Sequence, residues 1–496
     1  MTLRLFNTLT GEVEPLVPAD GRALRMYACG PTVYDYGHIG NFRTFLAVDV
    51  LRRALRLDGI QVRHVMNITD VDDKIIRNAA KAGIPIGEYT ARFEQAFFED
   101  LEALRVEKPE QLARATEHIP QMVALIEKLA EAGAAYKAED GSWYFRLAAF
   151  PEYGKLSKKD LSGIEDGARV DVDEYEKDSA RDFALWKAAK EGEAWWETAI
   201  GRGRPGWHIE CSAMAIEYLG ESLDLHAGGE DLMFPHHENE IAQSETVTHK
   251  PFARHWMHVR FLLVDGRKMS KSEGNFYTLR DLLLKGFKAS AIRMALISVP
   301  YRHQLNFTFD VLRDATAAID RLRTFKQRMT ETKWPEGIGG EAGTEVQALA
   351  ETAKRKFREA LEDDLNTAEA RAAIFDLVRA VNTKADAGEL FAGEVPAVLE
   401  ALAEFDSVFD LIEDRDAEPT RRALERARES GRLSEVAPEL VAAQSVSDAE
   451  IEALVAERTA AKKARNFARA DAIRTELAEK GVVIEDSKDG VRWKRK

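Results

Sequence analysis

The stretch LRMYACGPTVYDYGHIGNFRTFLAVDVLRRALRLDGIQVRHVM, residues 24–66, decides the fold of this chain. Its first residues, 24–29, form a short apolar run closed by a Gly-Pro pair, which is typical of a buried strand. Beyond Gly40, apolar residues recur at helical spacing, and they are Phe45, Val48, Leu51 and Leu55. Residues 61–66 then alternate as a strand does. Strand, helix and strand within about 45 residues make a βαβ unit, which predicts a parallel sheet.

The composition is that of a globular protein with several domains. The chain has 496 residues, of which 45% are hydrophobic and 31% charged. Its net charge of −15 argues against indiscriminate binding of nucleic acid, although it leaves room for a local basic face. Only two cysteines occur, which favours a reducing compartment. We see no signal peptide and no apolar run near the roughly 20 residues that span a bilayer, so we expect a cytoplasmic protein.

The sheet pattern predicts a Rossmann-like catalytic domain over residues 1–307. Residues 109–203 inside it are rich in charge, and we expect a helical insertion between the two halves of the sheet. The sheet resumes with a strand from about residue 222. A further strand is predicted over residues 256–264, within a signature-loop region that runs to residue 307.

After about residue 308 the chain changes to long stretches of Ala, Leu, Glu, Arg and Lys, which predict an α-helical domain over residues 308–412. Residues 413–447 are polar and are predicted as a linker with a helix. Residues 448–496 hold two helical patterns, the second with Phe467, Ile473 and Leu477 on its apolar face, and end in a predicted hairpin. The fold class is therefore α/β, followed by a helical half and a small helical and hairpin domain.

The tetrapeptide His38-Ile39-Gly40-Asn41 lies where the first strand meets the first helix. Phosphates bind at such a place, because the helix N-terminus presents free N–H groups. Gly40 lets a nucleotide approach the backbone, and His38 can donate a hydrogen bond to charge developing on a phosphoryl group. Taken alone, these four residues favour a surface histidine beside a turn.

A second motif, Lys268-Met269-Ser270-Lys271-Ser272, follows the last predicted strand. Two lysines three residues apart suit a loop that closes on a triphosphate. Taken alone, they would be interpreted as a solvated basic turn. The two motifs fall in the two halves of one predicted sheet, which favours a shared nucleotide site.

Four residues form a potential metal site. His236 and Glu240 are four residues apart, which places them on one helix face, and Pro235 is expected at the first position of that helix. Cys29 ends the first strand and Cys211 follows later in the chain. Two thiolates, one imidazole and one carboxylate suit Zn²⁺. Spacing alone leaves open a surface His-Glu pair with two core cysteines.

The neighbours His237 and Glu238 are expected to point elsewhere on the same helix. A zinc hydrolase built around His236, His237 and Glu240 is the alternative from another enzyme class. It would leave both cysteines and the lysine loop unexplained.

The two nucleotide motifs resemble the signatures of the class I aminoacyl-tRNA synthetases, in the same order along the chain. The resemblance implies catalytic roles for His38, Asn41, Lys268 and Lys271, and ATP binding by His38, Gly40, Asn41, Asp231 and Lys271. The class usually has His where Asn41 stands. Asn keeps a donor but no charge, so we expect somewhat weaker stabilisation of the transition state.

Longer stretches resemble the cysteine-specific branch of that class, the cysteinyl-tRNA synthetases. They are Cys29-Gly30-Pro31-Thr32-Val33-Tyr34-Asp35 with His38, Asn67-Ile68-Thr69-Asp70, Arg204-Pro205-Gly206-Trp207-His208-Ile209-Glu210-Cys211 and residues 228–240. The resemblance implies activation of L-cysteine with ATP and Mg²⁺, then transfer to tRNA(Cys), in a monomer without a membrane segment. It also implies one zinc ion per chain, held by Cys29, Cys211, His236 and Glu240, that binds the thiolate of the substrate.

By the same resemblance, Thr69, Trp207, His226 and Asp231 frame the cysteine and its adenylate. Residues 308–412 would bind the anticodon, with a motif at Asp363-Asp364-Leu365-Asn366-Thr367, and residues 448–496 would bind tRNA. Basic residues such as Lys354, Arg355 and Arg358 on the helical domain would ordinarily be a solvated face.

Two related functions remain as alternatives. One is the cysteine ligase of mycothiol synthesis, which acylates an amino sugar and lacks the full C-terminal extension. The other is a non-catalytic RNA-binding relative, which only Asn41 supports. The residues after about 410, together with Glu240-Ile241-Ala242-Gln243, fit the tRNA enzyme better.

Overall fold

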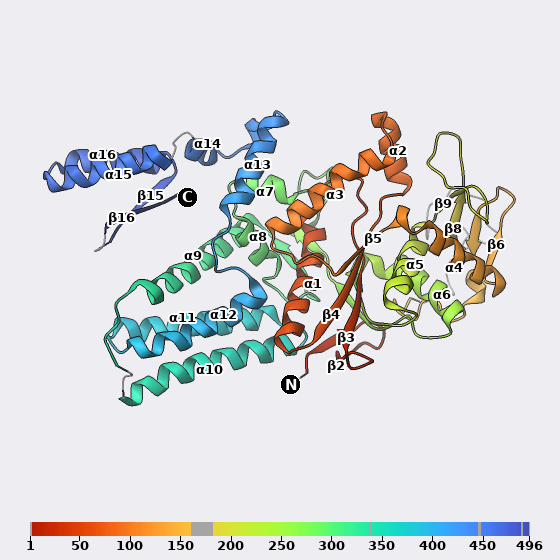
Figure 1. Ribbon diagram of the computed structural model, residues 1–496, viewed down its shortest axis with the longest axis horizontal. Helices are drawn as coiled ribbons and strands as arrows, with labels where there is room; N and C mark the ends of the chain where they lie inside the picture. The colour runs from red at the N-terminus through yellow and green to blue at the C-terminus, as the bar shows by residue number, and fades with distance from the viewer. Residues whose placement is uncertain (1, 160–181, 338–339, 445–447, 488–489, 496) are drawn as a thin grey trace. The chain divides into compact units, whose positions relative to one another are not determined.

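The computed structural model describes residues 2–159, 182–337, 340–444, 448–487 and 490–495 (Figure 1). The chain forms two compact units. The first comprises Met1–Phe276 with Arg293–Glu413, and the second Tyr277–Ile292 with Asp414–Lys496. Among the described residues, none of the helices is long and apolar enough to cross a membrane.

A parallel sheet of five strands forms the centre of the first unit, as the sequence predicted. The strand order is β11-β10-β3-β4-β5, and every neighbouring pair is parallel. Its strands are β3 (Ala23–Ala28), β4 (Gln61–Ile68), β5 (Gln111–Arg114), β10 (Leu223–Gly229) and β11 (Ala253–Val259). From β3 the sheet grows through β4 and β5 on one side and through β10 and β11 on the other. The strand order therefore reverses between β3 and β10, and ligands bind at such a point in open α/β sheets.

Helix α1 (Ile39–Leu57) connects β3 to β4 and confirms the βαβ prediction. The four apolar residues that predicted it are all buried. Polar residues of α1 such as Arg43 and Asp49 are buried too, because α1 contacts both the sheet and helix α12 (Val395–Phe409). Helices α2 (Asp73–Ala82) and α3 (Ile86–Ala103) follow β4, and a hairpin of β1 (Arg4–Asn7) and β2 (Glu12–Pro15) precedes β3.

The segment predicted as a helical insertion contains a second sheet, so that expectation was wrong. After α4 (Ile119–Glu131) come four antiparallel strands, β6 (Ala135–Lys137), β7 (Trp143–Phe145), β8 (Phe183–Ala188) and β9 (Gly203–Pro205). These strands are short and separated by charged turns, which hid their periodicity. The main sheet also takes up β5, which lies inside the predicted insertion, 109–203. Residues 160–181 of that range lie outside the described residues.

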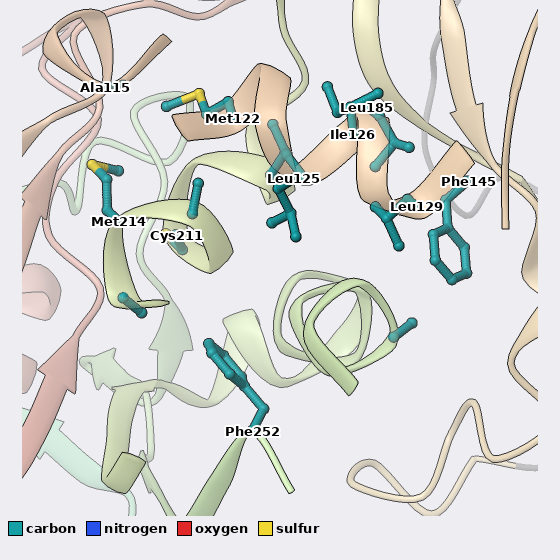
Figure 2. Close-up of a cluster of buried hydrophobic side chains, with 14 of the residues drawn as sticks. Ala115, Met122, Leu125, Ile126, Leu129, Phe145, Leu185, Cys211, Met214 and Phe252 are labelled. Carbon is teal, nitrogen blue, oxygen red and sulfur yellow. The ribbon is translucent and has the colours of Figure 1, made fainter. Parts of the chain in front are cut away.

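A hydrophobic cluster joins this inserted part to the central domain (Figure 2). Leu125 and Leu129 of α4, Phe145 of β7 and Leu185 of β8 are buried in one cluster with Cys211. Cys211 belongs to α5 (Trp207–Leu219), which follows β9. The packing thus fixes the helix that carries this cysteine.

The strand predicted over residues 256–264 is divided between two sheets. β11 ends at Val259, and the Arg260 N–H donates to the Tyr301 carbonyl, which is not part of the central sheet. β12 (Leu262–Val264) then pairs with β13 (Arg267–Lys268) and with β14 (Leu305–Phe307). The lysine-rich motif begins in β13.

The helical domain consists of α9 (Phe309–Glu331), α10 (Gly340–Glu362), α11 (Thr367–Asp386) and α12 (Val395–Phe409). Asn366 caps α11, as its spacing to Glu369 suggests, because its side chain accepts the Glu369 N–H. Asp364 accepts hydrogen bonds from the Phe6 N–H and the Tyr301 hydroxyl. The Asp363-Asp364-Leu365-Asn366-Thr367 motif therefore anchors these helices to the catalytic domain.

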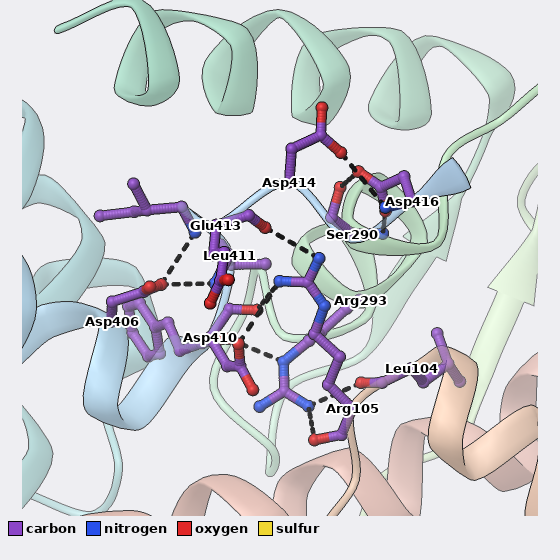
Figure 3. Close-up of polar contacts among 12 residues, drawn as sticks. Leu104, Arg105, Ser290, Arg293, Asp406, Asp410, Leu411, Glu413, Asp414 and Asp416 are labelled. Atoms are coloured by element: carbon purple, nitrogen blue, oxygen red, sulfur yellow. Dashed lines mark hydrogen bonds and ion pairs between the residues drawn. The ribbon is translucent and has the colours of Figure 1, made fainter. Parts of the chain in front are cut away.

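A buried polar junction also links the helical and catalytic domains (Figure 3). Arg293, in α8 (Ala289–Leu296), is fully buried and pairs with Asp49 of α1 at 2.6 Å. It donates to the carbonyls of Leu104, after α3, and Phe409, at the end of α12. The Arg293 guanidinium thus binds a carboxylate of α1 and backbone carbonyls at the ends of α3 and α12.

The second unit contains α7 (Leu279–Leu284), α13 (Ala417–Glu429), α14 (Pro438–Gln444), α15 (Asp448–Lys463), α16 (Phe467–Glu479), β15 (Val482–Ser487) and β16 (Gly490–Arg495). Helices α13 and α14 occupy most of the range predicted as a linker, of which residues 445–447 lie outside the described part. The predicted hairpin is β15–β16. Ile473 and Leu477 are buried, but Phe467 is 61% exposed and not part of the core as predicted. Phe467 is the first residue of α16 and lies outside the cluster that buries Ile473 and Leu477.

Candidate active site and metal centre

The polar side chains gather where the strand order of the central sheet reverses. Cys29 directly follows β3, and His226 lies on the neighbouring strand β10. Cys211 comes from α5, and the α6 region supplies His236 and Glu240. Four segments that are far apart in sequence therefore meet at the place where this kind of fold binds ligands.

The four predicted metal ligands lie together in the interior. Their ligand atoms are all within 4.8 Å of one another, and all four residues are buried. The two sulfur atoms of Cys29 and Cys211 are 4.0 Å apart. Oε1 of Glu240 lies 3.8 Å from the Cys29 sulfur and 3.1 Å from Nε2 of His236.

The helix that carries Glu240 begins later than predicted. Regular helix α6 (Glu238–Thr248) follows a π-helical turn at Met233–His237. Phe234 has an extended backbone, with φ −140° and ψ 128°, so a helix cannot run through it. Pro235 is therefore in the turn and not at the first position of α6, although His236 still lies against Glu240.

His237 and Glu238 have different environments. His237 does not point away as expected, because its Nε2 is 3.4 Å from the Cys29 sulfur and its Nδ1 is 2.8 Å from Nε2 of His258. Glu238 does point elsewhere, and accepts the backbone N–H groups of Gly154, Leu156 and Ser157. It holds that turn of the inserted part against α6.

A second set of potential ligands overlaps the first. Cys29, His226, His237 and Glu240 also lie within 4.8 Å of one another. Nε2 of His226 is 2.8 Å from Oε2 of Glu240, so the two carboxylate oxygens face different histidines. His226 and His237 are fully buried. Beside His236, in contrast, Trp207 is 40% exposed, with the ring centroids 4.3 Å apart. The predicted set therefore has a side through which a further ligand could enter.

The charges in the cluster favour a bound cation. The hydrogen bond from Cys29 lowers the pKa of Cys211 to about 6, whereas burial raises the pKa of Cys29. Burial opposes charge on Glu240 and His236, but the nearby histidines lower the pKa of Glu240 to about 2. Cys211 and Glu240 raise the pKa of His236 to about 10 despite its burial. Two sulfurs, one imidazole and one carboxylate, all buried, fit the tetrahedral set of Zn²⁺.

The first nucleotide motif is a capping box at the start of α1. Nδ1 of His38 accepts the Asn41 N–H at 3.1 Å, and Oδ1 of Asn41 accepts the His38 N–H at 3.0 Å. Because Nδ1 is an acceptor, the proton of the neutral ring is on Nε2. Burial lowers the pKa of His38, and Asp231 partly opposes this shift. His38 is therefore a neutral donor with a fixed ring.

The lysine-rich motif lies against the first motif. A Cβ on Gly40 would be 3.0 Å from the His38 ring and 3.5 Å from Cε of Met269, which leaves little space for a larger residue. Nζ of Lys271 pairs with Oδ2 of Asp35 at 2.5 Å. The Lys271 side chain is 66% exposed. Lys268 and Asp231 are exposed as well.

The remaining predicted pocket residues divide into two groups. Trp207 is partly exposed, whereas Thr69 is buried and its Oγ1 donates to Oε2 of Glu210 at 2.8 Å. His226 is fully buried and stacks on Trp256 at 4.5 Å between centroids. Sequence reasoning did not single out Glu210, although it lies between Trp207 and Cys211 in a stretch that carried the resemblance.

The basic residues of α10 are engaged in ion pairs. Lys354 pairs with Glu351 and Glu400, and Arg358 pairs with Glu404. Arg355 pairs with Glu359 on its own helix. This face is the solvated, paired surface that the sequence suggested as its ordinary interpretation.

Two family models and a solved structure define the class of protein to which this chain belongs. Residues 15–317 match the catalytic domain of class I tRNA synthetases (C), and residues 356–413 match the DALR domain. Methionyl-tRNA synthetase of Mycobacterium tuberculosis, solved with methionyl-adenylate, superposes with a TM-score of 0.59 at 15% identity, over 83% of this chain and 96% of that one. This chain is therefore a class I aminoacyl-tRNA synthetase in fold.

The more particular family follows from the sequence. Residues 447–493 match the anticodon-binding domain of cysteinyl-tRNA ligase. The cysteine–tRNA ligases of Koribacter versatilis and Solibacter usitatus are 59% and 55% identical, each over 100% of both chains. That of Symbiobacterium thermophilum is 46% identical, also over 100% of both. The chain belongs to the cysteine–tRNA ligase family, and it is an aminoacyl-tRNA ligase of protein biosynthesis. The full-length match supports neither the mycothiol-pathway ligase nor the non-catalytic relative.

Proposed function

We propose that this ligase activates L-cysteine with ATP and Mg²⁺, releases pyrophosphate, and transfers the cysteinyl group to the 3′ end of tRNA(Cys). We further propose that one zinc ion per chain is held by Cys29, Cys211, His236 and Glu240. The observation that supports this most strongly is the buried cluster of these four side chains. We expect the enzyme to work as a monomer in the cytoplasm.

When bound, zinc would supply a soft Lewis acid that prefers the thiolate of cysteine to the hydroxyl of serine. A methylene-sized difference in a pocket discriminates by only about 10–200-fold, so side-chain packing alone would not separate such similar substrates. Trp207 covers the accessible side of His236 and would exclude water beside the substrate. His226 orients Glu240 through its second oxygen.

On the phosphate side, Nε2–H of His38 would donate to the α-phosphate as the cysteine carboxylate attacks it. The capping box assigns Asn41 a positioning role, since its side chain holds the backbone of His38. Lys268 and Lys271 would neutralise the leaving pyrophosphate, and Lys271 would have to exchange Asp35 for phosphate oxygens. Asp231 would lie near His38, because its charge acts to raise the pKa of that histidine.

In the second unit, Phe467 is a suitable contact for tRNA. It is 61% exposed at the start of α16, and Lys463 and Arg465 just before it are exposed as well. An exposed aromatic ring beside two cations suits stacking on an unpaired base with neutralisation of the neighbouring phosphates.

The metal proposal is tested by His236→Ala, with His249→Ala as the matched control. His249 is exposed at the end of the same helix, so its loss should change nothing. His236→Ala should lower the zinc content, measured by atomic absorption, and raise the KM for cysteine. Full zinc content with an unchanged KM in His236→Ala would contradict the ligand assignment.

The tRNA proposal is tested by Phe467→Ala, with Phe467→Tyr as the variant that keeps a ring. Stacking is worth roughly 1–3 kcal/mol per base, so Phe467→Ala should lower kcat/KM for tRNA by about 5–150-fold. Cysteine-dependent pyrophosphate exchange should stay at the wild-type rate in both variants. Normal charging of tRNA by Phe467→Ala would contradict the proposal that Phe467 contacts tRNA.

A further inference from the structure

Arg43 is a buried cation to which the mechanism proposed above gives no part. It lies on α1, two residues after Asn41, and is 2% exposed. Among the described residues, no carboxylate forms an ion pair with it, although the charge of Glu230 acts on it. Burial lowers the pKa of Arg43 to about 10, so the guanidinium stays charged at neutral pH. A buried charge is costly unless polar groups surround it, so its hydrogen bonds need an explanation.

The hydrogen bonds of Arg43 go to three backbone carbonyls. Its Nη1 donates to Phe261 at 3.4 Å, and its Nη2 donates to Pro300 at 3.4 Å and to His303 at 2.5 Å. Phe261 directly precedes β12, and His303 lies two residues before β14. These two strands are parallel neighbours in the three-stranded sheet β13-β12-β14. Arg43 therefore holds the end of this sheet at which both strands begin.

Glu230 binds the same end of the sheet from another element. It directly follows β10, and its Oε1 accepts the Phe261 N–H at 2.9 Å. The backbone of Phe261 is thus held through its carbonyl by α1 and through its N–H by the residue after β10. The base of the three-stranded sheet is attached in this way to both elements that flank the reversal of strand order.

The three-stranded sheet carries the lysine-rich motif. Lys268 ends β13, and the loop follows it. After the loop, the ring of Phe276 meets the ring of His38 edge-on, with the centroids 5.4 Å apart, and Nζ of Lys271 lies 5.0 Å from the Phe276 centroid. His38 itself caps α1. The groups that we assign to the phosphates therefore depend on how this sheet is placed against α1.

We propose that Arg43 is a positioning residue for the activation of cysteine, because its guanidinium fixes the sheet that carries the lysine-rich motif against the helix that begins at His38. This inference rests on the function proposed above. A planar guanidinium can donate to carbonyls of two separate segments at once, whereas the point charge of a lysine lacks this fork. Since a displacement of about 1 Å between reacting groups can cost about 10²-fold in rate, a contact remote from the phosphates still acts on the reaction.

The test measures cysteine-dependent pyrophosphate exchange in Arg43→Lys, which keeps the charge but loses the fork of donors. We expect kcat to fall by about 10–100-fold, because the lysine loop is misplaced. The KM for cysteine and the zinc content should stay within about twofold of wild type, since Arg43 contacts neither the metal cluster nor Trp207. Circular dichroism shows whether each variant is folded at the assay temperature.

Arg52→Lys is the matched control. Arg52 also lies on α1, is 4% exposed and pairs with Glu110. It donates to the carbonyls of Glu107 and Lys108, which are not part of the three-stranded sheet. The same substitution therefore removes similar buried hydrogen bonds from the same helix. It should leave the rate of exchange within about twofold of wild type.

A double substitution separates positioning from a general structural role. In Lys271→Ala most of the contribution of the loop is already lost, so adding Arg43→Lys should slow exchange by less than about threefold. A residue with a merely structural role would slow both backgrounds by the same factor. If Arg43→Lys does not fold, Glu230→Ala replaces it, because the Glu230 side chain is partly exposed. This variant should slow exchange by about 10-fold alone and by less than about twofold in Lys271→Ala.

Three results would overturn the assignment of Arg43 and leave the proposed function intact. One is wild-type kcat in Arg43→Lys or, if that variant does not fold, in Glu230→Ala. Another is an equal loss of kcat in Arg52→Lys. The third is the same fold-loss in the Lys271→Ala background as in the wild-type background. If the zinc-loaded wild-type protein shows no cysteine-dependent exchange, the proposed function fails and the role of Arg43 fails with it.

Discussion

The proposed metal cluster and the lysine loop, to which we assign parts of one reaction, are built in opposite ways. Around the metal cluster, His236 and Glu240 are 2% exposed or less, and the histidines next to Glu240 are bonded in turn. In the loop, Lys271 is 66% exposed and pairs with Asp35, which is itself 37% exposed. One region is assembled by the fold itself, whereas the other depends on its ligand.

Burial explains the difference. Polar groups without water must satisfy one another, so the positions of the cluster residues are mutually fixed. An exposed ion pair contributes only about 0–1 kcal/mol, so the Lys271–Asp35 contact can be exchanged for phosphate at small cost. The arrangement suits a rigid site for selecting the amino acid and an adjustable one for stabilising a short-lived charge.

The largest effect is expected where a buried charge is removed. Arg293→Met removes one of the two arginines that pair with buried Asp49, the other being Arg53, and takes the donor from the buried carbonyls of Leu104 and Phe409. This loss should lower the free energy of unfolding by about 3–5 kcal/mol. Arg313→Met is the control, because Arg313 pairs with Asp310 at the surface and should matter by about 0.5 kcal/mol or less. Urea denaturation measures both. Equal effects of the two substitutions on the free energy of unfolding would contradict the expected difference between buried and exposed ion pairs.

Lys271→Ala should slow cysteine-dependent pyrophosphate exchange by about 10²–10³-fold, as expected when one donor to a transition-state charge is lost. Zinc content should not change, because Lys271 is not in the metal cluster. Arg267→Ala removes an exposed charge from the adjoining strand β13 and should have little effect. A wild-type exchange rate in Lys271→Ala would show that the loop does not act on the phosphates.

His226→Asn should lower the affinity for zinc by about 10–100-fold, because it removes the group that orients Oε2 of Glu240. Competition with a chromophoric chelator measures the affinity, and His249→Asn is the exposed control. If zinc affinity survives this substitution, the cluster is less interdependent than the hydrogen bonds indicate.

Asp35→Asn is expected to have the smallest effect, and in the favourable direction. It releases Lys271 from its ion pair, so the KM for ATP should fall by up to about fivefold, which corresponds to roughly 1 kcal/mol. The difference from wild type should shrink as salt is added. A higher KM for ATP would instead mean that Asp35 holds Lys271 in its active position.

Local patterns predicted much of this structure. The spacing of Phe45, Val48, Leu51 and Leu55 predicted α1, and the strands on either side followed from their apolar runs. The four-residue spacing of His236 and Glu240 suggested a common ligand site, and the structure brings both side chains to the two cysteines.

Features that depend on distant contacts could not be predicted in this way. His237 was expected to point away, because a helical wheel does not include the turn at Phe234 that redirects its ring towards Cys29. Phe467 fits a helical apolar pattern, but it is exposed at the first position of α16, outside the cluster that buries Ile473 and Leu477. The hydrogen bond of Glu210 could not be predicted either, because its partner Thr69 lies 141 residues earlier in the chain.

The most direct test of the account is cysteine-dependent ATP–pyrophosphate exchange by the purified protein, before and after zinc is removed with a chelator. Serine serves as the control amino acid. We expect exchange with cysteine and none with serine. Chelation should abolish the exchange, and added zinc should restore it. Exchange that continues undiminished in protein shown to be free of zinc would contradict the role given to the buried cluster.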